Sequence, residues 1–275
     1  MSEAEPITPQ PPVTLPDLPR NRLSIAQLML WTLGSAIMLA GFRFFRQVPQ
    51  QDPGPLDTVN SLYQLSISLP LGAQLGSVLL WGWNLVARKR GFPFQPGQWV
   101  LLVEGLANFL GLIGYAVCIL AMNRLALVKD RDLTYLVVQL PVLIVSVVGY
   151  SWAWWSLRRE SGIWKVAIAC LVGQQALFLL AAFGALRLYL SESTVFGPAG
   201  MMGPMRLQTY CCAPASALLV GLAGISDLLH RRGQRDYLHW TGVLSLVVAT
   251  LLQFLLPWIV GWALRWQQIN SAIVL

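Results

Sequence analysis

Seven long apolar runs, separated by short polar or charged segments, dominate the pattern along this chain. Each run has at least 18 residues, and about 17 to 25 apolar residues are enough for a helix to cross a bilayer. In lipid every backbone amide needs a partner inside its own segment, so we expect helices and not strands. The pattern predicts an all-α, polytopic transmembrane helix bundle with about seven spans, and six spans is the alternative. The expected spans are 25–42, 62–87, 99–122, 135–157, 163–190, 211–229 and 238–264.

The two ends of the chain differ from the apolar region between them. Residues 1–24 hold six prolines and few large apolar side chains, which favours a solvated tail over a ligand for a polyproline-binding partner. Arg20 and Arg22 precede the first run, as in a signal peptide, but that run continues to Phe42, so we expect an uncleaved span. The predicted segments are a disordered, proline-rich cytoplasmic tail at 1–24, a transmembrane domain at 25–264 and a short C-terminal tail at 265–275.

Composition excludes a soluble domain. Hydrophobic residues make up 56% of the chain and charged residues 11%, with a mean hydropathy of +0.58, whereas soluble domains carry about 25% charged residues. The net charge of +7 comes from basic residues in short groups beside the apolar runs. We interpret these groups as topology signals and as contacts with anionic lipid headgroups, and not as a nucleic-acid surface.

Basic residues and tryptophans indicate the orientation. In the seven-span arrangement the side with the N-terminus collects 11 Lys and Arg and the other side 8, so the positive-inside rule places the N-terminus in the cytoplasm. Loop 122–134 weakens the count because it puts three basic residues outside. A belt of tryptophans at span ends on the N-terminal side supports the same orientation. Its members are Trp81, Trp83, Trp99, Trp152, Trp154, Trp155, Trp164 and Trp240.

The entry into the first span carries a resemblance. The segment Arg22–Thr32, RLSIAQLMLWT, resembles the start of many uncharacterised polytopic bacterial membrane proteins, in which a basic residue and a short S-I-x-Q-L segment lead into the first helix. The resemblance implies a protein of the bacterial inner (cytoplasmic) membrane. It implies no activity and no functional residues.

Three pairs of small residues, spaced four apart, lie inside the expected spans. Small residues at this spacing let helix backbones approach closely in lipid. We interpret them as packing sites between spans of this chain, and a homodimer face is the alternative. The pairs are Gly72 and Gly76, Ala169 and Gly173, and Ala217 and Gly221.

Glu104 is the only carboxylate well inside an expected span, and burying it costs several kcal/mol unless it is paired or protonated. It shares a helix face with Asn108, Gly111 and Tyr115, as a proton relay or an ion site would require. However, Glu104 lies about 7.5 Å past Trp99, where the helix dipole favours a carboxylate. We therefore predict a structural role, with the carboxylate turned toward the headgroups or toward the basic residues of 88–90.

Neutral amides inside the spans extend this candidate set. Such side chains more often bridge helices than line a path through the membrane. We interpret them as inter-helix contacts, and a polar path is the alternative. The candidate residues for either role are Glu104, Asn108, Gln139, Gln174 and Gln253.

Signatures of catalysis and of cofactor binding are missing. His230 and His239 are the only histidines, so the chain has no H-E-x-x-H and no pair of mid-membrane imidazoles for haem. We expect both to be interfacial polar residues. The sequence also lacks G-x-S-x-G, a phosphate-binding loop and a lysine in the last span. We predict no enzyme activity and no cofactor.

One loop, residues 191–214, is rich in methionine and cysteine. Thioether and thiolate groups suit Cu(I), but the spacing matches no defined site and flexible methionine often fills gaps. We therefore predict no metal and keep Cu(I) as a remote alternative. Its ligands would be Met201, Met202, Met205, Cys211 and Cys212.

Two classes of function remain open. The sequence favours a noncatalytic membrane protein, an assembly, scaffold or sensory component that contacts lipid headgroups and a membrane-protein partner or a second copy. The alternative is a small transporter or channel, with Glu104 and the intramembrane amides lining a polar path. An odd span count without internal symmetry fits poorly with two inverted repeats, which argues against the alternative.

Overall fold

In the computed structural model of this chain, the residues described are 25–45, 55–88, 95–125, 131–158, 162–190, 207, 211–230 and 235–273. These residues form seven long helices and no strand. Each helix holds a stretch that is long and apolar enough to span a membrane, which confirms the predicted all-α bundle of seven spans. The helices are α1 (Ile25–Phe45), α2 (Pro55–Arg88), α3 (Pro96–Leu125), α4 (Arg131–Ser156), α5 (Gly162–Leu190), α7 (Ala213–His230) and α8 (Tyr237–Ile273).

Several helix ends differ from the expected spans. Helices α2 and α3 begin earlier, at Pro55 and Pro96. Proline suits the first helical position because its missing N–H would have no partner there. Helix α8 continues to Ile273, so part of the predicted C-terminal tail is helical. The predicted disordered tail at 1–24 lies outside the described residues.

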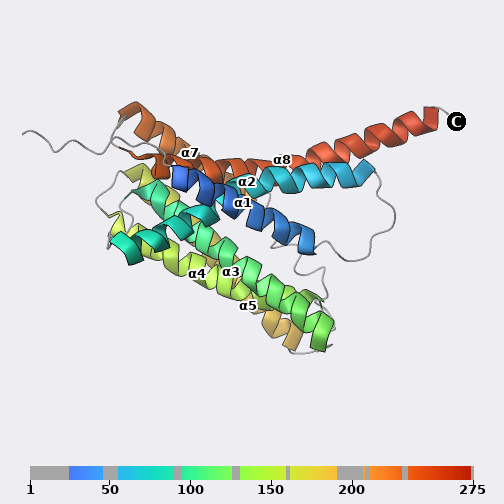
Figure 1. The fold of residues 1–275 in the computed structure, drawn as a ribbon, viewed down its shortest axis with the longest axis horizontal. Helices are drawn as coiled ribbons and strands as arrows, with labels where there is room; N and C mark the ends of the chain where they lie inside the picture. The colour runs from blue at the N-terminus through green and yellow to red at the C-terminus, as the bar shows by residue number, and fades with distance from the viewer. Residues whose placement is uncertain are drawn as a thin grey trace, which may run out of the picture.

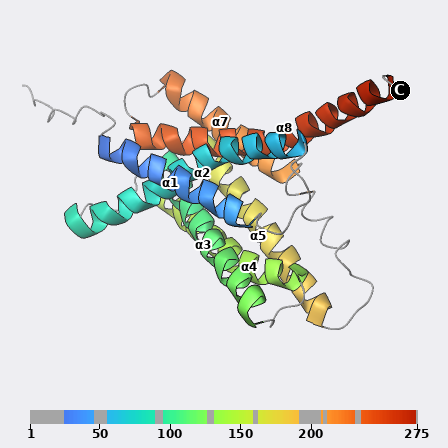
Figure 2. The same cartoon turned by 45° about the vertical axis from the view of Figure 1, so that its right-hand side comes forward.

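Five of the helices form a closed ring. Around it, α3 contacts α4, α4 contacts α5, α5 contacts α7, α7 contacts α8, and α8 returns to α3. Helix α2 packs on α3 and α8, and α1 packs on α2. In Figure 1 the group α3, α4 and α5 runs at an angle to α2 and α8, and the turned view in Figure 2 shows the same divergence.

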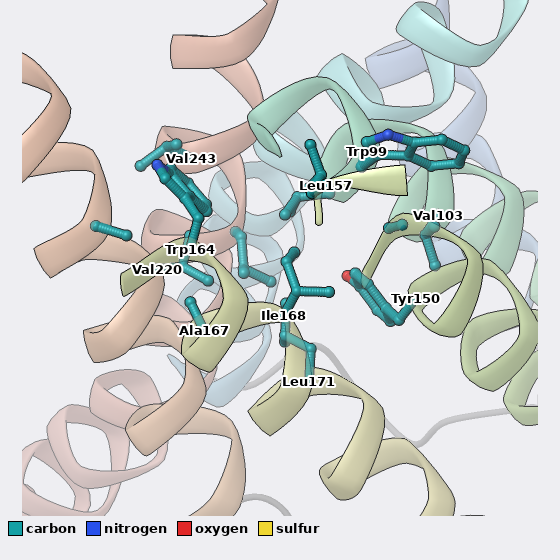
Figure 3. Close-up of a cluster of buried hydrophobic side chains, with 14 of the residues drawn as sticks. Trp99, Val103, Tyr150, Leu157, Trp164, Ala167, Ile168, Leu171, Val220 and Val243 are labelled. Atoms are coloured by element: carbon teal, nitrogen blue, oxygen red, sulfur yellow. The ribbon is translucent and has the colours of Figure 1, made fainter. Parts of the chain in front are cut away.

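The main hydrophobic core fills the end of the ring where α3, α5 and α8 begin and where α4 and α7 end. Trp164 and Tyr150 are its largest fully buried side chains, and Ile168 lies between them (Figure 3). A smaller cluster joins α4 to α5 nearer the other end. Among the described residues, most of the clustered buried hydrophobic side chains lie at this end of the ring. The remaining main-core residues are Trp99, Val100, Leu102, Val103, Ala153, Leu157, Ala167, Leu171, Val220, Ala223, Val243 and Leu246.

Glycines set the closest contact between α1 and α2. A Cβ added at Gly72 would lie 2.2 Å from the Ser35 Cα, and one at Gly76 would lie 2.5 Å from the Leu30 carbonyl oxygen. Backbone atoms cannot give way as the end of a side chain can, so both positions need glycine. This confirms the predicted packing role of the Gly72–Gly76 motif inside the chain.

The other two small-residue pairs behave differently. Ala217 is buried, and a Cβ at Gly221 would contact Val247 of α8 at 3.6 Å, so this pair packs inside the chain as predicted. Ala169 is exposed, and a Cβ at Gly173 would meet nothing within 4 Å. For α5 the predicted packing inside the chain is therefore wrong, because this helix turns a different face toward the core. The alternative homodimer face stays a prediction.

Candidate functional site

Glu104 lies on α3 and faces α4. The Tyr150 hydroxyl donates a hydrogen bond to Glu104 Oε1 at 2.5 Å, and Tyr150 is fully buried. Helix α3 starts at Pro96, so Glu104 lies about 12 Å along the helix from its first residue. The expected partners were headgroups or the basic residues of 88–90. The side chains of 88–90 lie outside the described part of the chain, and within the described part the carboxylate pairs with a hydroxyl of the neighbouring helix.

Asn108, one turn further along α3, bonds to a different helix. Its Nδ2 donates to Gln74 Oε1 of α2 at 2.7 Å, and Gln74 Nε2 donates to Ser245 Oγ of α8 at 3.3 Å. Gln74 and Ser245 are buried. These three side chains tie α2, α3 and α8 together, which is the bridging role that amides commonly have between helices in lipid.

The remaining predicted site residues lie apart from these two contacts. Gln139 Nε2 donates to the Tyr115 hydroxyl at 3.5 Å, the outer limit for a hydrogen bond. Gln174 is buried in α5, and its Oε1 has no hydrogen-bond partner in the described structure. Gln253 is exposed on α8. Glu104, Asn108, Gln139, Gln174 and Gln253 therefore do not form one hydrogen-bonded site.

The remote copper alternative gains no support. Met201, Met202 and Met205 lie outside the described residues. Cys211 is exposed and Cys212 is partly buried, and both are free thiols. Within the described part of the chain, no group of three or more His, Cys, Asp or Glu side chains is placed to hold a metal.

A polar cluster that the sequence reading missed lies at the packed end of the ring, with Asp227 of α7 at its centre. Asp227 Oδ2 accepts hydrogen bonds from Trp164 Nε1 of α5 and from Arg235 Nε, both at 2.8 Å. His239 Nε2 of α8 lies 3.5 Å from the same oxygen. All four side chains are buried, and Asp227 is only 3% exposed. We call these four residues the Asp227 cluster. It joins α5, α7 and the start of α8 through a buried ion pair.

His239 also holds the start of α3. The Gly97 N–H donates a hydrogen bond to His239 Nδ1 at 3.0 Å, so Nδ1 is the acceptor nitrogen and the ring proton lies on Nε2, toward Asp227. The ring is 0% exposed and meets Trp164 edge-on, with centroids 5.3 Å apart. Its neighbours enclose His239 completely, a burial that the prediction of an interfacial polar residue did not include. His230, in contrast, is exposed as expected.

Two glycines allow the backbones of α3 and α8 to approach closely beside His239. A Cβ at Gly97 would lie 2.1 Å from the His239 carbonyl oxygen, and one at Gly242 would lie 1.9 Å from the Gly97 carbonyl oxygen. The backbones of α3 and α8 are therefore in contact here. That contact is what brings the Gly97 amide within hydrogen-bond reach of the imidazole.

The first residues of α3 and α8 cap one another beside the Asp227 cluster. Asp236 Oδ1 accepts from the His239 amide at 2.8 Å, an N-cap for α8. Its other oxygen accepts from Gln98 Nε2 at 2.5 Å, and Gln95 Oε1 accepts from the Asp236 amide at 3.0 Å. Gln98 Oε1 also accepts from the Gln95 amide, which is one of the two hydrogen bonds of a capping box on α3. An aspartate before an apolar helix and the run Q-P-G-Q are signals that could have revealed both caps.

The chemistry open to these groups follows from their burial. Asp227 and His239 are almost completely enclosed, so a substrate could reach neither unless the helices moved apart. The cluster therefore fixes helix positions in the state described. Comparison of the chain with protein-family models, curated proteins and solved structures finds no match. The fold defines the class, a multi-pass membrane protein with seven apolar helices.

Proposed function

We propose that this protein is a noncatalytic component of the bacterial inner membrane that acts through contacts with lipid and with membrane-protein partners, as an assembly, scaffold or sensory element. One observation carries the proposal: polar groups inside the bundle bond mostly to one another across helix boundaries. Glu104 bonds to Tyr150, Asn108 to Gln74, and Asp227 to Trp164 and Arg235. Such pairing supports a fixed helical frame whose outer faces meet its partners.

The orientation proposed for this frame places the packed end at the cytoplasm. Trp152, Trp154 and Trp155 are between 49% and 60% exposed at that end, as side chains that reach the headgroup region would be. The Arg158 guanidinium lies 5.3 Å from the Trp155 ring centroid. An exposed cation beside exposed tryptophans suits anionic headgroups.

A reporter fusion tests this orientation. A fusion after Leu275 is expected to behave as extracytoplasmic, because seven spans from a cytoplasmic N-terminus end outside. Paired alkaline phosphatase and fluorescent-protein fusions would measure it, with fusions in the 159–161 connection as the cytoplasmic control. A cytoplasmic signal after Leu275 would refute the orientation.

A small transporter is the second candidate, and one observation favours it. Along the face of α3 that includes Glu104, burial decreases away from the packed end: Val100 is fully buried, but Gly111 and Tyr115 are partly exposed. A Cβ at Gly111 would meet only Val142, at 3.9 Å. This face is polar and loosely packed, as the lining of a path for protons or small ions would be.

Glu104→Gln separates the two candidates. Glutamine keeps an oxygen that can accept from Tyr150, so we expect stability within about 1 kcal/mol of the native protein and unchanged proton permeability in proteoliposomes. Thermal unfolding in detergent and an internal pH-sensitive dye would measure the two properties. Tyr150→Phe is the control, because it removes the donor and leaves the carboxylate charge.

One outcome would contradict the scaffold proposal, and another would contradict the expected stability of the variant. Loss of a proton flux in Glu104→Gln, with stability intact and the flux retained in Tyr150→Phe, would establish the transporter reading. A large loss of stability in Glu104→Gln would show that the charge itself is needed. The charge would then have a cationic partner beyond the Tyr150 hydroxyl.

A further inference from the structure

The junction between α3 and α8 depends on a neutral imidazole. His239 Nδ1 accepts from the Gly97 amide at 3.0 Å, and only an unprotonated ring nitrogen can accept. A protonated ring carries an N–H on both nitrogens, so it would direct a second N–H at the Gly97 N–H. It would also bring a positive charge to the first turn of α3, where the helix dipole is positive.

The charged groups around His239 already form hydrogen bonds with other partners. Of the described residues, Asp227 of α7 faces Nε2 at 3.5 Å, and the same oxygen accepts from Trp164 and Arg235 at 2.8 Å. Asp236, ahead of α8, accepts from the His239 amide and from Gln98. Helices α3 and α5 present uncharged groups here, the Gly97 amide and the Trp164 indole. Asp227 would attract a second ring proton at Nε2, but that position already carries the proton of the neutral ring.

The junction leaves the ring no room to adjust. The Gly97 and Gly242 positions bring the two backbones so close that an added Cβ would lie 2.1 and 1.9 Å from carbonyl oxygens. The ring itself is fully buried between Trp164 and Trp240. Loss of the Gly97 hydrogen bond therefore has to move the start of α3 relative to α8.

We infer that His239 is an acid-sensitive latch, which holds the start of α3 against α8 when the ring is neutral and releases it when the ring takes up a proton. The unfolded ring takes up a proton below about pH 6.5, whereas the docked ring has to remain neutral. Stability that the latch contributes is therefore present at neutral pH and decreases as the pH falls below about 6.5. This property is independent of whether the frame serves as a scaffold or a transporter.

The test compares the full chain in detergent at about pH 7.5 and about pH 5 with the variant His239→Asn. Asparagine Oδ1 can take the place of Nδ1 as the acceptor for Gly97 and does not titrate. The native unfolding midpoint is expected to fall by at least about 4 °C more than that of the variant. Equal shifts in both proteins would overturn the latch, because other carboxylates would then explain the acid response.

Hydrogen exchange gives a second measurement that does not need the variant. After correction for the chemical rate, exchange in the segments around Gly97 and His239 is expected to rise at least about threefold at the lower pH. Segments at the α1–α2 contact around Gly72 are the internal control and are expected to stay unchanged. No change near Gly97, or an equal rise in both regions, would refute a local latch.

Discussion

Gly242→Ala is expected to lower the free energy of unfolding by about 3 kcal/mol or more. The new Cβ would lie 1.9 Å from the Gly97 carbonyl oxygen, a backbone atom that cannot rotate away. Relief requires α3 and α8 to separate, which also breaks the His239–Gly97 hydrogen bond. Overpacking in cores costs about 1 to 3 kcal/mol and sometimes more. Here the free-energy cost of overpacking and the cost of the lost hydrogen bond add to one another.

Gly173→Ala is the matched control for this substitution. It adds the same methyl group to a glycine of another spanning helix, where the Cβ would meet nothing within 4 Å. Alanine is favoured over glycine inside helices by about 1 kcal/mol, so this variant is expected to be as stable as the native protein or slightly more so. Denaturant titration in mixed micelles would measure both. If the two variants lost similar free energy of unfolding, the α3–α8 contact at Gly242 would be no more tightly packed than the surroundings of Gly173.

Asp227→Asn is expected to destabilise the fold by about 3 to 5 kcal/mol. The substitution keeps the shape of the side chain but removes the charge that Arg235 faces at 2.8 Å. Both side chains are almost fully buried, so the guanidinium would be left as an uncompensated cation. The fraction of protein that stays monodisperse after heating in detergent would report the loss.

Two further variants define the origin of that effect. Arg158→Gln removes a cation from the exposed Arg158–Trp155 contact and is expected to cost no more than about 1 kcal/mol. The double substitution of Asp227→Leu with Arg235→Met removes both charges and is expected to recover part of the stability. Recovery stays partial because Trp164 Nε1 loses its acceptor. If Asp227→Asn were as mild as Arg158→Gln, the buried ion pair would not stabilise the bundle.

The spans could be predicted from the sequence because lipid imposes a simple rule on them. A run of apolar residues such as 99–122 has to be a helix, and its length alone shows that it crosses. The exact start could not be predicted the same way, because Gly97 and Gln98 fix the first turn of α3 through hydrogen bonds to the distant residues His239 and Asp236. Those contacts depend on how two helices meet.

The site was harder to predict, for a related reason. The spacing of Glu104 and Asn108 shows that they share a helix face, but the two side chains bond to different neighbours, Tyr150 on α4 and Gln74 on α2. Small-residue spacing was equally ambiguous: Gly72 packs tightly, whereas Gly173 faces outward. Which side of a helix faces the core depends on all its neighbours together, so it cannot be predicted from the sequence of that helix alone.

Helix length has a consequence for the surrounding lipid. Helices α2 and α8 pack on each other and contain 34 and 37 residues, or about 51 and 55 Å, far more than a hydrocarbon core of about 30 Å. Helix α7, on the other side of α8, has only 18 residues, or about 27 Å. Hydrophobic mismatch with the bilayer depends on the apolar stretch of a helix and not on its whole length. The apolar stretches of α2, α7 and α8 are similar, at 20, 18 and 19 residues, so the extra length of α2 and α8 extends past the hydrocarbon core, where it meets headgroups and water.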